Sequence, residues 1–251
     1  MTQILFIHGM YMTGGSWHRW EDWFRGHGYG TQAPSWPGRD AEPAALRANP
    51  PEILSTLTLQ DVVDQYADLI RDMDEPPVLV GHSMGGLVVQ LLLQRGLGAR
   101  GVAIDSAPPQ GLNSFKWSFL KSNAPVLWPG SAPLRPTPAS WKYAFAHTLS
   151  DAEAHDAFET YVVPESRLVG KGAATATAKV DFAKDRPPLL LIAGEEDHII
   201  PASLNRKNYD RYSASPAVTE FREFPGRTHW ICGMEGWEEV AGAVKDWIAS
   251  A

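Results

Sequence analysis

The stretch "VLVGHSMGGLVVQ", residues 78–90, places a serine where a predicted strand meets a predicted helix. Gly81 and Gly85 lie two positions before and after Ser83, which gives the pattern G-x-S-x-G. A nucleophilic serine on a sharp strand-to-helix turn needs small residues there, because larger side chains would collide. The stretch lacks both the dinucleotide pattern G-x-G-x-x-G and the lysine of a phosphate-binding P-loop. It therefore indicates a nucleophilic serine.

A serine is a weak nucleophile at neutral pH, so Ser83 needs a general base, and the base needs an acid to orient it. His229, in "FPGRTHW", is predicted to lie in the loop between the last strand and the last helix. Asp197, in "LLLIAGEEDHIIP", follows a predicted buried strand. These three residues have the chain order Ser, Asp, His and could form a catalytic triad. Asp105, which directly follows "GVAI" at residues 101–104, remains an alternative acid.

Other polar residues near these positions are weaker candidates. His82 precedes the nucleophile and is predicted to be a buried structural histidine, and His198 is expected to face away from the site. Cys232 could be a second nucleophile, although a small apolar residue near the site is the simpler interpretation. The remaining candidates are expected on the surface or in packing: Glu195, Glu196, His18, His27, His147 and His155.

Acyl transfer also needs N–H groups that stabilise an oxyanion. The residue after the nucleophile supplies one such backbone N–H, here that of Met84, at a helix start where the dipole helps. The second is expected from the loop after the first strand, "HGMYMTGG" at residues 8–15, and most simply from Met10.

The elements that position these residues follow an alternating order of strands and helices. Apolar runs predict buried strands at 4–7, 78–80, 101–104 and 189–193, with weaker strands near 29–33 and 217–224. Residues 58–73, capped by Thr58 and Asp61, and the segment from Trp237 to Ile248 have helical periodicity. The pattern predicts an α/β fold with a doubly wound, mostly parallel sheet of about six strands.

Residues 107–186 interrupt this alternation. Seven prolines lie between Pro108 and Pro138, and residues 150–161 have a helical pattern that Ser150 caps. The apolar and aromatic content argues against disorder. We therefore expect a core formed by residues 1–106 and 187–251, with residues 107–186 inserted as a helical cap, or lid, over the strand ends that form the ligand crevice.

The composition narrows the class of protein. The chain has 251 residues, 44% of them hydrophobic, and a formal charge of −7, which argues against nucleic acid or an anionic membrane as the main partner. The first residues resemble neither a signal peptide nor a membrane span, so a cytoplasmic protein is expected. A single cysteine excludes an internal disulfide framework. No residues have the spacing of metal ligands, and no cofactor is expected.

The motifs "HGM", "GHSMGG", "GEEDHIIP" and "GRTHW" make the chain similar to the α/β-hydrolase superfamily over nearly its whole length. The compact six-stranded branch that it resembles contains small esterases and plant-type hydroxynitrile lyases. Ser83 stands where dehalogenases and epoxide hydrolases have Asp, which disfavours those activities. His82 replaces the Phe usual in bacterial perhydrolases, and Trp230 replaces the lysine of the plant lyases, so both activities are also disfavoured.

The resulting hypothesis is a metal-free serine hydrolase that cleaves a carboxylic ester or a lactone through an acyl-enzyme. The substrate would be a small molecule with an apolar or aromatic group, and a compact lactone would suit a small roofed pocket. Candidate substrate-binding residues are Tyr11, Trp117, Trp128, Trp141 and Trp230. Two alternatives remain: a ligand receptor with little or no turnover, and a cofactor-free lyase or oxygenase that uses His229 as a base.

Overall fold

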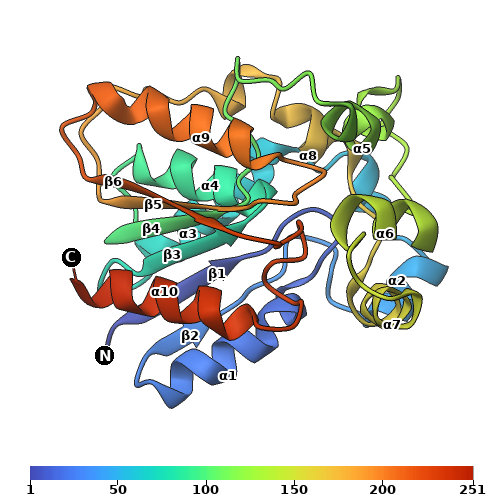
Figure 1. The fold of residues 1–251 in the computed structure, drawn as a ribbon, viewed down its shortest axis with the longest axis horizontal. Helices are drawn as coiled ribbons and strands as arrows, with labels where there is room; N and C mark the ends of the chain where they lie inside the picture. The colour runs from blue at the N-terminus through green and yellow to red at the C-terminus, as the bar shows by residue number, and fades with distance from the viewer. Residues whose placement is uncertain (251) are drawn as a thin grey trace.

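The structure is a computed structural model that describes residues 1–250 of the chain. One parallel sheet has the strand order β2-β1-β3-β4-β5-β6 (Figure 1). Its strands are β1 (Gln3–Ile7), β2 (Gly30–Gln32), β3 (Val78–His82), β4 (Arg100–Ile104), β5 (Leu189–Gly194) and β6 (Thr219–Phe224). The predicted α/β fold with six strands is confirmed, and β6 lies at an edge of the sheet.

Helices cover both faces of the sheet (Figure 1). One face carries α1 (His18–Gly26) and α10 (Trp237–Ser250), and the other carries α3 (Leu59–Arg71), α4 (Met84–Leu93) and α9 (Ala202–Arg211). Successive side chains of a strand point to opposite faces. In β1, Phe6 accordingly packs in the core under α1 and α10, whereas Leu5 and Ile7 pack in the core under α3 and α4.

Capping residues set where several helices begin. Oγ1 of Thr58 accepts from the N–H of Asp61, and the N–H of Thr58 donates to the Asp61 carboxylate in return, which starts α3 as the sequence predicted. Ser150 and Glu153 form the same capping box at the start of α7 (Asp151–Tyr161). The short 3-10 helices are η1 (Gly14–Trp17), η2 (Glu52–Ser55), η3 (Ala176–Ala178) and η4 (Tyr212–Ala214).

The segment predicted as a cap, residues 107–186, contains α5 (Trp117–Leu127), α6 (Pro138–Phe145), α7, α8 (Arg167–Gly172) and η3. Helices α5, α6 and α7 stand at one end of the sheet together with α2 (Pro43–Ala48), whereas α8 packs against α3 (Figure 1). Trp141, Phe145 and Phe158 form a separate apolar cluster there with Trp230 of the core. None of the helices within residues 1–250 has both the length and the apolarity needed to cross a bilayer.

Candidate active site

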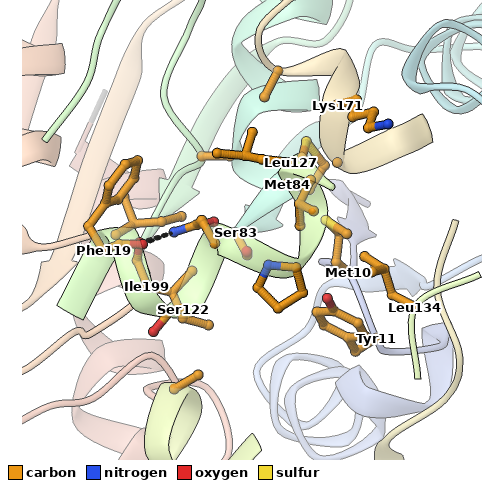
Figure 2. Close-up of a pocket in the computed structure, with 18 of the residues that line it drawn as sticks. Met10, Tyr11, Ser83, Met84, Phe119, Ser122, Leu127, Leu134, Lys171 and Ile199 are labelled. Carbon is orange, nitrogen blue, oxygen red and sulfur yellow. Dashed lines mark hydrogen bonds between the residues drawn. The ribbon is translucent and has the colours of Figure 1, made fainter. Parts of the chain in front are cut away.

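Ser83 lies on a strained turn between β3 and α4, with φ of 56°. A Cβ atom added at Gly81 would lie 2.2 Å from the carbonyl oxygen of Gly85, and one added at Gly85 would lie 2.1 Å from that of Ile7. Because these oxygens belong to the backbones of α4 and β1, they cannot move aside without disturbing those elements, so both positions require glycine. The turn presents Ser83 at the wall of a cavity (Figure 2).

Strain of this kind is concentrated at the site. The non-glycine residues with positive φ in the described chain are Tyr11 (67°), Ser83 (56°) and Asp105 (43°). They lie in the segments that follow β1, β3 and β4, which are neighbours in the sheet. Each such conformation costs on the order of 1–3 kcal/mol and persists only where the surroundings impose it. The three turns after these strands therefore cost stability, which is typical of functional sites.

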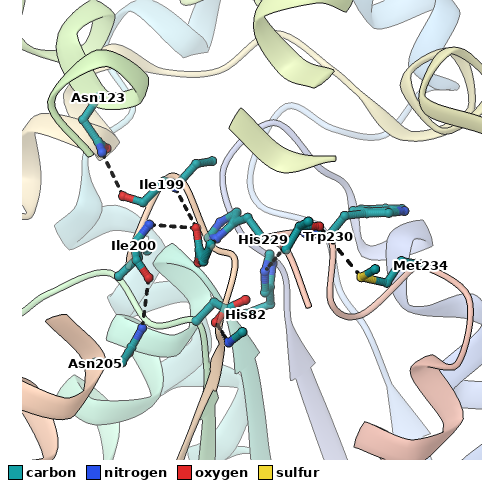
Figure 3. A network of polar contacts seen from close by, with 12 residues as sticks. His82, Asn123, Ile199, Ile200, Asn205, His229, Trp230 and Met234 are labelled. Carbon is teal, nitrogen blue, oxygen red and sulfur yellow. Dashed lines mark hydrogen bonds and ion pairs between the residues drawn. The ribbon is translucent and has the colours of Figure 1, made fainter. Parts of the chain in front are cut away.

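His229 and Asp197 form a buried pair at the ends of β5 and β6. The Nδ1–H group of His229 donates to Oδ2 of Asp197 at 2.6 Å, and both side chains are fully buried. The other oxygen of Asp197 accepts from the backbone N–H groups of Ile199 at 2.7 Å and Ile200 at 2.9 Å (Figure 3). These bonds fix the carboxylate, which in turn orients the imidazole.

This pairing leaves Nε2 of His229 with its lone pair, and that atom has no hydrogen-bond partner among the described residues. Burial lowers the pKa of His229 to about 3, so the imidazole is neutral at pH 7. Burial also raises the pKa of Asp197, while the N–H groups of Ile200 and Ile199 lower it. A neutral imidazole with a free Nε2 can accept a proton from a neighbouring group.

His82 connects the histidine loop to the serine turn. Its Nε2–H group donates to the carbonyl oxygen of His229 at 2.9 Å, and the two rings lie 4.7 Å apart (Figure 3). Because His82 immediately precedes Ser83, this bond holds His229 beside the serine turn. No hydrogen bond joins Ser83 to Nε2 of His229 within residues 1–250. Catalytic contacts of this type often tighten only when a substrate binds.

The alternative acid, Asp105, makes different contacts. One of its oxygens accepts from the N–H of Gly194 at 2.7 Å, and the other has no partner among the described residues. Burial and the nearby Asp197 raise the pKa of Asp105. The geometry thus pairs His229 with Asp197 and not with Asp105.

A possible metal-ligand set also lies here. Ligand atoms of His82, Asp105 and His229 lie within 4.8 Å of one another, although the sequence spacing gave no sign of it. These residues come from separate strand ends and meet only in the fold. The hydrogen bonds from His82 to the His229 carbonyl and from His229 to Asp197 already use one nitrogen of each ring.

Two backbone N–H groups beside Ser83 are available for an anion. Met10 and Met84 both line the cavity, and their N–H groups have no acceptor within residues 1–250. Met84 begins α4, where the helix dipole favours negative charge. A Cβ atom added at Gly9 would lie 2.8 Å from Cβ of Ser83, so the loop that carries Met10 closely approaches the serine.

A buried ion pair that sequence reasoning missed holds this loop. Glu165 accepts from the N–H of Tyr11 through Oε2 at 3.0 Å, and Val163 N–H donates to the carbonyl of Tyr11 at 2.9 Å. The other oxygen of Glu165 accepts from Ser166 N–H at 2.6 Å and from Arg39 at 2.5 Å. Glu165 and Arg39 are both buried. No local pattern marks either residue in the sequence.

The cavity has a volume of about 920 Å³ and lies between the strand ends and residues 107–174 (Figure 2). Of the predicted substrate-binding residues, Tyr11, Trp128 and Trp141 line it. Trp117 and Trp230 do not. Trp117 projects into solvent from α5, and Trp230 packs edge-on against Trp141, with ring centroids 5.7 Å apart.

All charged residues that line the cavity, among the described residues, are positive. Lys121, Arg135, Arg167 and Lys171 line the cavity, and no Asp or Glu does so among the described residues. These cations are scattered along the sequence, so no cluster was evident before the fold was known.

The remaining candidates lie apart from the reacting atoms. His198 donates through Nδ1 to the carbonyl of Tyr143 at 2.9 Å, and its ring stacks on that of His147 with centroids 3.6 Å apart. His198 therefore makes its contacts away from the pair formed by His229 and Asp197. Burial and the neighbouring Asp105 raise the pKa of the Cys232 thiol, which therefore stays protonated at neutral pH. A protonated thiol is a poor second nucleophile.

Several proteins of known structure are similar to this chain in fold. Polyneuridine aldehyde esterase is 17% identical, with a TM-score of 0.70 and coverage of 98% of each chain. A monoacylglycerol lipase from Paleococcus ferrophilus is 19% identical, with a TM-score of 0.69 over 99% of this chain and 94% of that one. Tomato methylketone synthase I, complexed with 2-tridecanone, is 14% identical, with a TM-score of 0.73 over 99% and 98%.

At sequence identities below 20%, these structural similarities show only that the fold is shared. A search of curated protein sequences finds no match. The model of the alpha/beta hydrolase family, however, matches residues 4–243, which is nearly the whole sequence. The chain therefore belongs to the alpha/beta hydrolase family.

Proposed function

We propose that the protein is a serine hydrolase that cleaves a carboxylic ester through an acyl-enzyme, with Ser83 as nucleophile, His229 as general base and Asp197 as the orienting acid. The observation that carries this proposal is the buried Asp197–His229 hydrogen bond of 2.6 Å, which leaves a neutral imidazole with a free Nε2 beside the serine turn. This is the arrangement that activates a serine hydroxyl.

In this mechanism Ser83 Oγ attacks the ester carbonyl carbon while its proton moves to Nε2 of His229. The oxyanion that forms accepts from the N–H groups of Met10 and Met84, each worth about 100–1000-fold in rate. His229 then gives the proton to the leaving alcohol, and the carbon–oxygen bond to that alcohol breaks. Water, deprotonated by His229, releases the acid and regenerates Ser83.

The cavity supports a substrate with a sizeable apolar or aromatic group. The cavity volume of about 920 Å³ lies near the upper end of the range for small-molecule sites. It is larger than the small roofed pocket expected for a compact lactone. Polyneuridine aldehyde esterase and the monoacylglycerol lipase, both named for ester substrates, share the fold. We therefore favour an ester over a small lactone, with residues 107–186 acting as the cap that encloses it.

Labelling with a fluorophosphonate, followed by intact-mass measurement, tests the proposal. We expect one label per wild-type chain, none in Ser83→Ala, and slow labelling in His229→Ala and Asp197→Asn. Asp105→Asn is the matched control and should label at a rate close to wild type. Full-rate labelling of Asp197→Asn together with slow labelling of Asp105→Asn would overturn the choice of acid.

A folded wild type that takes no label would refute the acyl-enzyme mechanism. Measurements of turnover and of ligand binding would then separate the alternatives. Turnover of a substrate that survives Ser83→Ala would favour a lyase or oxygenase that uses His229 as base. Ligand binding without turnover would favour a receptor.

A further inference from the structure

The charges of the chain are segregated. Residues 106–150 contain no Asp or Glu but four basic residues: Lys116, Lys121, Arg135 and Lys142. All 29 acidic residues lie elsewhere, with the other 18 of the 22 Lys and Arg residues. A chain with a formal charge of −7 thus carries a segment with a charge of +4. The net charge, which argued against an anionic partner, does not describe this segment.

The same segment carries most of the exposed large hydrophobic side chains. Of the eight in the described residues, five fall between positions 115 and 128. Phe115 is 90% exposed, Trp117 74%, Leu127 68% and Trp128 64%, and Leu120 is the fifth. Isolated apolar side chains on a surface are ordinary, but five exposed large ones within 14 residues of one segment are typical of an interaction site.

Helix α5 has apolar residues on two faces. Phe119 and Val126 line the cavity, whereas Trp117, Leu120 and Leu127 follow 3-and-7 spacing along the exposed face. Leu127 and Trp128 are exposed and also line the cavity. We call the exposed side chains Phe115, Trp117, Leu120, Leu127 and Trp128 the outer apolar patch. The patch is therefore continuous with the mouth of the cavity.

Cations border the outer apolar patch without acidic partners. Lys116, Lys121 and Arg135 have no carboxylate within 4.0 Å in the described part of the chain, whereas Lys142 pairs with Asp151. Lys121 instead lies 3.7 Å from the centroid of the Tyr143 ring. Cations that no carboxylate neutralises remain available to an external anion.

The segment around the patch is held in place by contacts with α8 and with the loop that follows β5. Arg167 donates to the carbonyl oxygens of Pro125 and Ala132, and Lys171 donates to that of Gly130 at 2.9 Å. Asn123 donates to the carbonyl of Ile199 at 3.0 Å, which joins α5 to the loop that follows β5 (Figure 3). A pre-ordered surface loses little conformational freedom when it binds.

We propose that the outer apolar patch and its bordering cations dock the protein onto a lipid surface with anionic headgroups, with the cavity mouth facing the lipid. Aromatic and leucine side chains beside lysines are the composition with which peripheral proteins enter the headgroup region. The acidic remainder of the chain is repelled by such a surface, which orients the segment toward it. This docking does not depend on the chemistry at Ser83.

Vesicle co-sedimentation of the Ser83→Ala protein tests the proposal without hydrolysis of the lipid. We expect the protein to sediment with vesicles of equal parts phosphatidylcholine and phosphatidylglycerol, to be released by salt, and to bind pure phosphatidylcholine weakly. Each basic residue near an anionic surface contributes about fivefold in partitioning. Lys116→Glu/Lys121→Glu should therefore lower partitioning by at least about 25-fold.

Phe115→Ser/Trp117→Ser should also weaken binding, whereas two matched controls on other surfaces should not. These are Lys184→Glu/Lys207→Glu for charge and Ile53→Ser/Val218→Ser for exposed apolar area, each folded by circular dichroism. No sedimentation of the folded parent, or equal losses in the controls, would overturn the proposal. So would a dimer, detected by analytical ultracentrifugation, that Phe115→Ser/Trp117→Ser dissociates, because a second copy would then cover the patch.

Discussion

Replacing Glu165 with glutamine tests how the loop beside Ser83 is held. Three donors converge on the two carboxylate oxygens of Glu165: Arg39, Ser166 N–H and Tyr11 N–H. A glutamine has one carbonyl oxygen and one NH₂ group, so one of these donors would meet another donor. Because the site is fully buried, water cannot replace the lost acceptor.

Two effects of different size follow from this geometry. The Arg39 charge, left buried without its partner, lowers the free energy of unfolding by about 3–5 kcal/mol. Tyr11 has φ of 67° and loses the bond that holds it there, so the neighbouring N–H of Met10 moves. Since one oxyanion donor is worth about 100–1000-fold, we expect kcat to fall by about that factor, with a smaller change in KM.

The assay combines urea unfolding with hydrolysis of a water-soluble ester. Glu159→Gln is the matched control, because Glu159 also pairs with an arginine, Arg47, but is half exposed. Its loss should cost less than about 1 kcal/mol and leave kcat unchanged. The variant Arg39→Met/Glu165→Leu removes both buried charges and should recover stability while kcat stays low. A stable double variant with wild-type kcat would refute the reasoning.

Two further predictions concern stability. Burial lowers the pKa values of His8, His82 and His229 below the unfolded value near 6.5, so the unfolded chain binds more protons in acid. Stability present above pH 6.5 is thus lost as pH falls, by about 2 kcal/mol per histidine at pH 5. The raised pKa values of the two buried aspartates, Asp105 and Asp197, act in the opposite direction and reduce this loss. Urea unfolding should therefore show lower stability at pH 5 than at pH 7, by less than about 6 kcal/mol, and a rise in stability would contradict the direction assigned to the histidine pKa shifts. Gly85→Ala should destabilise the protein by about 3 kcal/mol, because the added Cβ would lie 2.1 Å from a backbone oxygen. The control Gly242→Ala in α10 adds a Cβ that meets nothing within 4 Å and should stabilise the protein by up to about 1 kcal/mol. Equal shifts of the thermal unfolding temperature in the two variants would show that the turn tolerates a side chain.

Local patterns predicted the elements because their causes are local. Apolar runs marked the strands, and the glycines around Ser83 marked a turn whose geometry depends on neighbouring backbone. The ion pair between Arg39 and Glu165 was not predictable in this way, since its partners lie 126 positions apart and each has ordinary neighbours in the sequence. Trp117 and Trp141 illustrate the same limit, because the sequence predicted that both bind the substrate. In the fold, the packing of α6 buries Trp141, whereas α5 leaves Trp117 exposed to solvent.

The three strained residues explain why the site needs both the sheet and the segment that follows β4. Ser83 keeps its conformation because the glycines on either side admit close backbone contacts, and Asp105 keeps its own through the N–H of Gly194 on the adjacent strand β5. Tyr11 has no such support from the sheet. Its backbone is held at both ends by Val163 and Glu165, which lie beyond α7. The loop that carries Met10 is therefore shaped correctly only after residues 163–165 have packed onto it. This couples formation of the proposed oxyanion site to docking of the segment that lines the cavity.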